Sequence, residues 1–220
     1  MIISNYMPIR RNQPWLADGD SADNCVAAWV FKGAASKVNS LIDLTGNGHN
    51  LTDGDDTHLT SWDATKGIGS NGVYPYLVSD VTPPNNQSSW SVLARFSEVT
   101  ASGLGCLFGS QATAQNWYWF IRPYNGVYRE YCNGSYYNKV PYATSGVIGF
   151  AGNTAYYNGA PDGTIPSHNG TAIQIYVLAI KDSVVGTSSR LNGKLQALFI
   201  YNVVKNDTKM SALTTAMAAL

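Results

Sequence analysis

The dipeptide Asn-Gly occurs seven times in this chain of 220 residues, spread between short apolar segments. Asn and Gly adopt positive φ angles at low cost, so the dipeptide is the strongest short-range signal for a tight turn between antiparallel strands. The copies begin at positions 47, 71, 125, 133, 158, 169 and 192. Their distribution predicts an all-β protein.

Nine apolar segments are the candidate strands, and they span residues 26–33, 72–80, 88–97, 104–110, 116–124, 126–132, 146–152, 172–182 and 194–204. Alternation is clearest in SWSVLARF, where Trp90, Val92, Ala94 and Phe96 share one face, which we expect to be core. QIYVLAI and LQALFIY are apolar on both faces, as expected of strands covered on both sides or at a subunit contact.

The two ends of the chain differ from the strand-rich part. Prolines and arginines interrupt any period in residues 1–22, so we expect an arm there, either an edge strand along the sandwich or a segment that docks into a partner. Residues 207–220 predict a short amphipathic helix with Asp207 or Thr208 as N-cap and an apolar stripe of Met210, Leu213, Met217 and Leu220. One domain is expected over residues 23–220.

Composition excludes several classes of partner. Lys+Arg and Asp+Glu both number 14, and only 13% of the residues are charged, so no electrostatic footprint for nucleic acid or an anionic membrane exists. No apolar run approaches the ~18 residues of a membrane span. Cys25, Cys106 and Cys132 show no paired spacing, and the N-terminal residues lack a secretion-signal pattern, which together predict buried thiols and folding in a reducing cytoplasm.

The stretch LIDLTGNGHNLTDGDD, residues 41–56, partly matches a calcium-loop pattern through Asp43, Thr45, Asn47 and Gly48. The twelfth position of that pattern needs a bidentate Glu, and this chain has Gly54 there. We therefore interpret the stretch as a tight turn, and we expect neither a metal nor a cofactor.

The acids and histidines of this chain give little support for catalysis. Glu98 and Glu130 are the only glutamates, and neither has an acidic neighbour two residues away, as paired glycosidase carboxylates on one strand would require. His49, His58 and His168 all fall in expected loops. No nucleophile elbow, phosphate loop or dinucleotide fingerprint occurs, so the sequence predicts a protein that is not an enzyme.

An aromatic and basic segment, residues 116–138, holds the candidate ligand-binding residues. If Trp117, Trp119 and Ile121 face the core, strand alternation turns their neighbours outward, and a turn at 125–126 brings the next strand alongside. Such a surface suits a glycan, and it equally suits contact with another protein subunit. The candidates are Tyr118, Arg122, Arg129, Tyr131, Tyr136 and Tyr137.

Several of these segments resemble a known family. LIDLTGNGHNLT, SWDATKGIGSNGVYPYL, WSVLARFS, GVIGFAGNTAYYNG and above all LNGKLQALFIYNVVKNDTKMSALTTAMAAL are similar to the concanavalin A-like, laminin-G-like jelly roll of tailed bacteriophages and prophages. The resemblance covers roughly residues 24–220. The calcium ligands and C-terminal disulfide of extracellular laminin-G domains cannot be matched here.

The resemblance implies a two-sheet antiparallel jelly-roll sandwich whose last core strand, Leu195 to Tyr201, runs into a terminal helix. It implies a virion accessory protein, such as a capsid decoration, head-fibre component or short tail adhesin, folded in the host cytoplasm. The implied partners are other virion proteins and a host cell-surface glycan, and the implied assembly is a homo-oligomer, trimeric by analogy with phage accessory proteins. The alternative is a glycan-active enzyme, a polysaccharide lyase or hydrolase.

Overall fold

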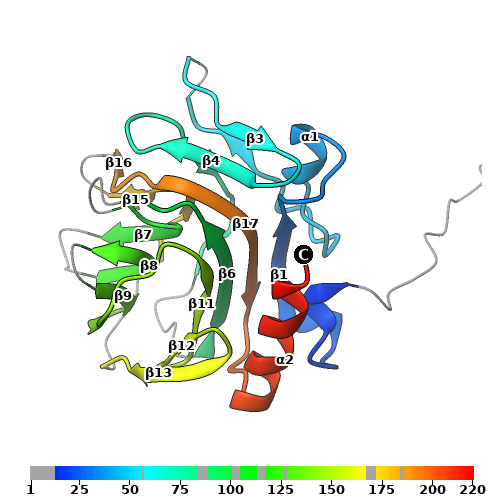
Figure 1. Cartoon of the computed structure of the whole chain (residues 1–220), viewed down its shortest axis with the longest axis vertical. Coiled ribbons are helices and arrows are strands. Elements are labelled where there is room, and N and C mark those ends of the chain that lie inside the picture. Colours follow the sequence, from blue (N-terminus) through cyan, green and yellow to red (C-terminus); the bar gives the residue numbers. More distant parts are fainter. Residues whose placement is uncertain are drawn as a thin grey trace, which may run out of the picture.

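The computed structural model describes residues 13–55, 57–83, 89–100, 105–112, 117–125, 128–166, 172–183 and 186–220. Two β-sheets pack face to face, and a C-terminal helix lies against one of them (Figure 1). The expected all-β sandwich with a short C-terminal helix is confirmed. Strand pairing is antiparallel throughout the named strands except between β15 and β7.

The first sheet has eight strands in the order β13-β12-β11-β6-β17-β4-β3, with β1 paired to β17. Its strands are β1 (Cys25–Val30), β3 (Ser61–Asp63), β4 (Gly67–Asn71), β6 (Ser91–Ser97), β11 (Gly146–Ala151), β12 (Thr154–Tyr157), β13 (Ala160–Thr164) and β17 (Asn192–Tyr201).

The second sheet has nine strands in the order β10-β9-β8-β7-β14-β5-β2, and β15 joins it through β7 and carries β16. Its strands are β2 (Thr52–Asp53), β5 (Leu77–Val78), β7 (Phe108–Ala112), β8 (Trp117–Asn125), β9 (Tyr128–Asn133), β10 (Tyr136–Lys139), β14 (Tyr176–Val177), β15 (Ile180–Asp182) and β16 (Gly186–Ser188).

The main core lies between the two sheets. In β6, Val92, Ala94 and Phe96 belong to it and Trp90 packs against it, as the alternation predicts. Leu93, on the opposite face of β6, belongs to a second apolar cluster outside the eight-stranded sheet. Each face of this sheet therefore buries apolar surface, which at ~25 cal/mol per Å² is the main favourable term in folding.

The helix α2 (Asp207–Ala218) explains why β17 is apolar on both faces. Leu198 and Ile200 point into the main core, whereas Phe199 and Tyr201 point into the second cluster, which α2 covers with Met210, Leu213 and Met217. The predicted apolar stripe is confirmed. The predicted N-cap is wrong, because the side chain of Asn206 accepts the bond from the Lys209 amide and takes that role.

The N-terminal segment packs beside α2 without joining a sheet. Residues 13–24 contain two 3₁₀ turns, η2 (Pro14–Leu16) and η3 (Ala22–Asn24), so the expected edge strand is not found in residues 13–22. Trp15 is buried in the second cluster, and its carbonyl accepts a hydrogen bond from the Tyr201 hydroxyl (2.9 Å). Residues 1–12 of the expected arm lie outside the described residues.

The Asn-Gly turns are largely confirmed. The glycines at 48, 72, 134 and 159 all have positive φ, and the turns at 133–134 and 158–159 join β9 to β10 and β12 to β13. The copy at 192–193 is an exception, because it lies inside β17, where a Cβ on Gly193 would stand 2.8 Å from the side chain of Val99. The copies at 125–126 and 169–170 fall wholly or partly outside the described residues.

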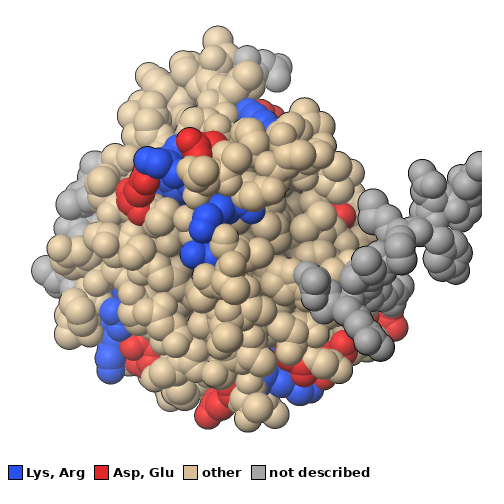
Figure 2. Space-filling model, turned by 45° about the vertical axis from the view of Figure 1, so that its right-hand side comes forward, with Lys and Arg blue, Asp and Glu red and all other residues tan. Residues whose placement is uncertain are grey.

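Charge is sparse on the surface. On the face shown in Figure 2 most side chains are neither acidic nor basic, and the charged ones gather in small groups. None of the described helices is long and apolar enough to cross a membrane.

Candidate binding surface

The predicted site residues divide between two faces of β8, β9 and β10. Trp119 and Ile121 are buried in the main core, as expected, while Tyr118 and Phe120 belong to a separate cluster on the far side of the sheet. We call that side the outer face of the nine-stranded sheet. The side chain of Trp117 lies outside the described residues.

Arg129 and Tyr131 do not lie beside Arg122, and the prediction that all three share the outer face is wrong. Asn125 pairs with Tyr128, and a register shift follows, so that Arg122 pairs with Glu130. A turn centred on 125–126 would instead have paired Arg122 with Arg129. A one-residue change of register moves every side chain of a strand to the opposite face, which sends Arg129 and Tyr131 inward.

Tyr137 is the third candidate that turns inward. It pairs with Tyr131 across β10 and β9, packs against the main core and donates a hydrogen bond from its hydroxyl to the Asp162 carbonyl (2.9 Å). Of the six predicted residues, the structure therefore brings together Tyr118, Arg122 and Tyr136 on the outer face, and it places Arg129, Tyr131 and Tyr137 inside.

The inward residues form an ion-paired cluster that ties the sheets together. Arg129 donates from Nε to Asp162 Oδ2 (3.0 Å) and from Nη2 to Asp162 Oδ1 (2.9 Å), and its guanidinium lies 4.3 Å from the ring centroid of Tyr157. Tyr131 donates from its hydroxyl to Asp162 Oδ2 (2.6 Å). Burial, followed by the neighbouring Asp162 carboxylate, raises the pKa of Tyr131. Because Asp162 belongs to β13, this cluster joins the two sheets and serves stability.

Arg122 is on the outer face, but each of its three side-chain nitrogens already donates a hydrogen bond. Its Nη1 donates to Glu130 Oε2 (2.7 Å), its Nη2 to Ser189 Oγ (3.0 Å) and its Nε to Cys106 Sγ (3.1 Å). Both charged side chains are nearly buried. Arg122 and Glu130 therefore form a structural ion pair beneath the surface. A ligand would not reach the Arg122 guanidinium without breaking these bonds.

Tyr118, Phe120 and Tyr136 form the first aromatic group of the outer face. The ring centroids of Tyr118 and Tyr136 are 5.0 Å apart, and those of Phe120 and Tyr136 are 5.8 Å apart. Phe120 is buried beneath them, whereas Tyr136 is 43% exposed. Partial burial, and then a hydrogen bond with Tyr118, raise the pKa of Tyr136. The rings of Tyr118 and Tyr136 therefore reach the surface and pack on the buried ring of Phe120.

Two further apolar side chains are exposed just after the edge strand β10. Val140 and Tyr142 are 62% and 45% exposed.

A second aromatic group on the outer face was not predicted from the sequence. Cross-strand pairing runs from Phe120 through Gly109 to Tyr176, so Tyr176 shares the outer face. Tyr76 stacks on it with ring centroids 4.7 Å apart. Lys181 lies 4.9 Å from the Tyr176 ring and donates to its hydroxyl (3.0 Å). These residues come from segments far apart in the chain, and only the sheet order brings them together.

The second aromatic group carries positive charge. Arg190 lies 6.0 Å from the Tyr76 ring, and its buried Nε makes no hydrogen bond to any described residue. Neither Lys181 nor Arg190 forms an ion pair with a carboxylate in the described parts of the chain. Tyrosine and arginine are enriched where proteins bind partners, whereas lysine is depleted there, so the two tyrosines and Arg190 are the residues of this group that suit an interface.

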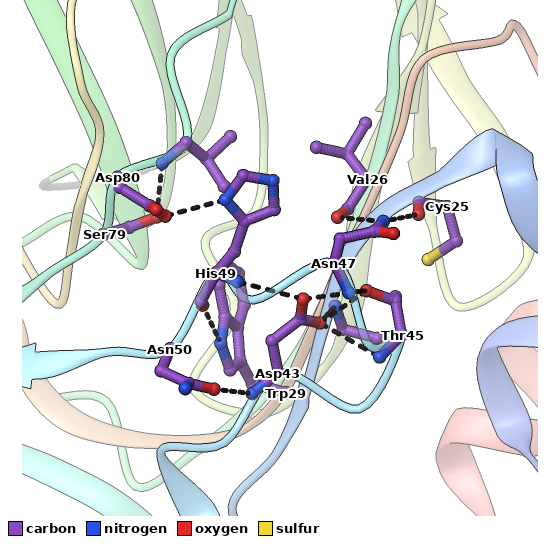
Figure 3. Close-up of polar contacts among 12 residues, drawn as sticks. Cys25, Val26, Trp29, Asp43, Thr45, Asn47, His49, Asn50, Ser79 and Asp80 are labelled. Carbon is purple, nitrogen blue, oxygen red and sulfur yellow. Dashed lines mark hydrogen bonds and ion pairs between the residues drawn. The ribbon is translucent and has the colours of Figure 1, made fainter.

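Residues 43–50 of the 41–56 stretch form a hydrogen-bonded turn, as predicted, and Thr52–Asp53 form β2. Asp43 Oδ1 accepts from the amides of Ala28 and Thr45 (both 3.1 Å), and Oδ2 accepts from the His49 amide (3.2 Å) (Figure 3). Asn47 donates from Nδ2 to the carbonyls of Cys25 and Val26, at 3.0 and 2.9 Å. The acidic and amide side chains thus fasten this turn to β1.

Two histidines in the described residues pair with single aspartates. His49 Nδ1 lies 2.7 Å from Asp80 Oδ1 (Figure 3), and His58 Nδ1 lies 2.9 Å from Asp55 Oδ2. Among the described residues, no group of three or more His, Cys, Asp or Glu side chains is placed to hold a metal ion. His168 lies outside the described residues.

Comparison with known proteins shows the fold. No protein-family model matches the chain, and no curated protein matches it in sequence. Domain 4 of AbnA, an extracellular arabinanase from Geobacillus stearothermophilus solved with arabinotriose, is similar over 87% of this chain and 98% of its own, with 17% identity and a TM-score of 0.53.

Two larger proteins contain a similar domain. Trypanosoma rangeli sialidase matches 90% of this chain with 13% identity and a TM-score of 0.56. The binding domain of botulinum neurotoxin DC, solved with rat synaptotagmin II, matches 90% with 11% identity and a TM-score of 0.57. This chain spans 33% of the sialidase and 52% of the toxin domain. At these identities the likeness establishes a shared β-sandwich fold.

Proposed function

We propose that this chain is a non-enzymatic accessory protein of a bacteriophage particle, carried on the capsid or the tail, and that its outer face attaches to another virion protein. One observation carries the proposal. The outer face of the nine-stranded sheet bears two aromatic groups and no described helix covers it, whereas α2 covers the corresponding face of the eight-stranded sheet (Figure 1). Tyrosine and arginine are enriched at the cores of protein interfaces.

The phage context of the proposal rests on the resemblance of the segments quoted above. The part most specific to that family is residues 191–220, which form β17 and α2 in the arrangement the resemblance implies. The assembly proposed by the same analogy is a homotrimer. Size-exclusion chromatography with light scattering tests it, since a monomeric mass at micromolar concentration contradicts a stable trimer.

A non-enzymatic role is supported by the ion pairs of the two glutamates. Glu130 is ion-paired with Arg122, and Glu98 with Lys66 (2.9 Å). Neither glutamate has an acidic residue two positions away in the sequence, as paired glycosidase carboxylates on one strand would require. The competing enzyme hypothesis predicts that the purified chain shortens a bacterial surface polysaccharide. If the chromatographic size profile of the polysaccharide stays unchanged across pH and divalent ions, the result supports a non-enzymatic role. If the polysaccharide is shortened, the enzyme hypothesis replaces our proposal.

A host cell-surface glycan is the second ligand that we propose for the outer face. Exposed tyrosine rings pack against the apolar faces of sugars, and Tyr118 and Tyr136 reach the surface side by side. A glycan array and a particle-loading assay on the same preparation separate the two partners. Loading without glycan binding assigns the face to protein attachment.

The decisive experiment is the double variant Tyr118→Ser with Tyr136→Ser. We expect it to fold and to lose at least tenfold in particle loading, because desolvated tyrosine anchors contribute about 2 kcal/mol or more each. The matched control is Tyr74→Ser, an exposed tyrosine that stacks on His58 rather than on the outer face. Equal loading by both variants would contradict the proposed surface.

The role of the arm needs a separate truncation. Deleting residues 1–12 leaves Trp15 in place, whereas deleting 1–22 would also remove a buried side chain. We propose that the shorter deletion abolishes incorporation into particles and keeps the melting temperature. Normal incorporation by that truncated protein would show that the arm is not the anchor.

A further inference from the structure

The N-terminal segment brings two aspartates to a buried lysine. Trp15 is seated against Phe199 with ring centroids 6.2 Å apart, and this contact fixes the residues that follow it. Asp18 and Asp20 then lie against Lys205, the residue that precedes the N-cap of α2. Residues almost at opposite ends of the chain therefore meet in one cluster.

The lysine and one of the aspartates are withdrawn from solvent. The side chain of Lys205 is 1% exposed and that of Asp18 is 0% exposed. Lys205 Nζ lies 2.6 Å from Asp18 Oδ2, 2.7 Å from Asp20 Oδ2 and 4.3 Å from the ring centroid of Tyr201. Burying both charges costs several kcal/mol of desolvation per ion, and replacing such a pair by neutral groups is often favourable.

The two aspartates meet the lysine in different ways. Asp20 Oδ2 accepts a hydrogen bond from Lys205 Nζ, and Asp20 also pairs with Lys209. Asp18 Oδ2 is as close to the same nitrogen, yet it makes no hydrogen bond to any described residue, so the 2.6 Å contact lacks the angles of one. Because Nζ is 2.6 Å from Asp18 Oδ2, it is also held close to the carboxyl carbon bonded to that oxygen, and such proximity favours reaction between the two groups.

We propose that Lys205 and Asp18 condense to form an intramolecular isopeptide bond. Within the pair, the ammonium gives one proton to the carboxylate, and the lone pair left on Nζ attacks the Asp18 carboxyl carbon. The new C–N bond replaces one C–O bond, and the oxygen leaves as water with two of the three ammonium protons, while the third stays on the amide nitrogen. The reaction is a condensation, so it needs no oxidant, reductant or further reactant.

Asp20 is the residue that handles protons in this step. Its Oδ2 touches Nζ and accepts the proton that nitrogen loses when the bond forms, and it returns that proton to the departing oxygen. Lys209 stays outside the reaction, because its side chain is 35% exposed and its contact is with Asp20 only. Exclusion of water around Asp18 disfavours hydrolysis of the product.

The first test is the intact mass of the purified full chain. We expect a mass lower than that of the sequence by one water molecule. Asp18 is followed by Gly19, and ring closure between them to a succinimide would lose the same mass. The variant Lys205→Arg separates the two reactions, since its guanidinium is not a nucleophile. We expect it to have the full sequence mass.

Peptide mapping of the wild-type chain gives a readout that needs no variant. A protease digest should contain one branched peptide that joins the segment around Asp18 to the segment around Lys205, and tryptic cleavage after Lys205 should be lost. Lys209→Arg is the matched control and should keep both the mass loss and the branched peptide. A wild-type chain at full sequence mass, or Lys205→Arg with the water still missing, would overturn the proposal.

The role of Asp20 has a kinetic test. In chain freshly made by cell-free synthesis, followed from the moment translation is stopped, Asp20→Asn should form the bond about 100-fold more slowly than wild type, the usual contribution of general acid–base catalysis. The measurement is the fraction of chain with the lower mass against time. An unchanged rate would remove Asp20 from the reaction.

Discussion

The outer faces of the two sheets lie in different surroundings. The outer face of the eight-stranded sheet carries Phe199 and Tyr201 beneath α2 and the segment around Trp15, so its aromatic side chains are core. The outer face of the nine-stranded sheet carries Tyr118 and Tyr136 near solvent and, beneath them, the ion pair of Arg122 and Glu130. Aromatic strand residues thus contribute to stability on one face and approach solvent on the other, where we propose that they bind a partner.

Glu130→Ala should show that part of the second face is nevertheless structural. The change leaves the Arg122 guanidinium buried without its carboxylate, which costs roughly 3–5 kcal/mol of unfolding free energy. Chemical denaturation measures it. The double change Arg122→Met with Glu130→Leu should recover most of the loss. Lys66→Ala, in the exposed pair with Glu98, is the control and should cost at most about 1 kcal/mol.

Leu213→Ala tests the covered face. The side chain is fully buried between α2 and the sheet, so truncation should lower the unfolding free energy by about 2–5 kcal/mol. Ala218→Ser, at an exposed position of the same helix, should stay within about 0.5 kcal/mol. If both variants unfolded at the same denaturant concentration, α2 would not be holding that face closed.

Tyr136→Ser tests the open face and should have a small effect on stability. The residue is partly exposed, so we expect a loss within about 1 kcal/mol, in contrast to Leu213→Ala. A loss as large as that of Leu213→Ala would mean that Tyr136 is core, and the comparison between the two faces would fail. Denaturation curves for the two variants under one set of conditions decide it.

Asp63→Asn should have the smallest effect, and its difference from wild type should shrink in acid. Hydrogen bonds from the Thr65 hydroxyl (2.6 Å) and amide (2.7 Å) lower the pKa of Asp63. A lowered folded-state pKa stabilises the protein above the unfolded value of about 4 and loses that contribution as pH falls further. Between pH 5 and pH 3 the wild type should therefore lose slightly more in melting temperature than Asp63→Asn. An identical acid dependence would contradict it.

The sequence predicted the sandwich because its signals are local. Alternation in residues 91–97 and the stripe of Met210, Leu213 and Met217 depend only on neighbouring positions, and both are confirmed. Strands such as β13 were missed, since APDGT contains three residues typical of turns and joins the sheet only through pairing with β12. Local pattern cannot report such pairing.

The candidate site was predicted less well, for two physical reasons. The register shift between Arg122 and Asn125 reverses the faces of Arg129 and Tyr131. Pro123 lies within the shift and could have signalled it, because a proline cannot donate to the strand ladder and is typical of bulges. Arg122 and Arg129 were also expected at the surface, yet both are buried and ion-paired with a carboxylate on another strand. The second group, Tyr76 with Tyr176, depends entirely on the order of strands in the sheet.

The pairing of β1 with β17 determines when the fold can be completed during synthesis. Cys25 pairs with Tyr201, so β1 must wait for nearly the whole chain before its partner exists. At roughly 5–20 residues per second, that delay is on the order of 10–35 s, during which the apolar strand Cys25–Val30 has no native partner. A ribosome that stops early would release a chain with an unpaired strand, which chaperones and proteases recognise. Completion of the last strand is thus a built-in check on chain length.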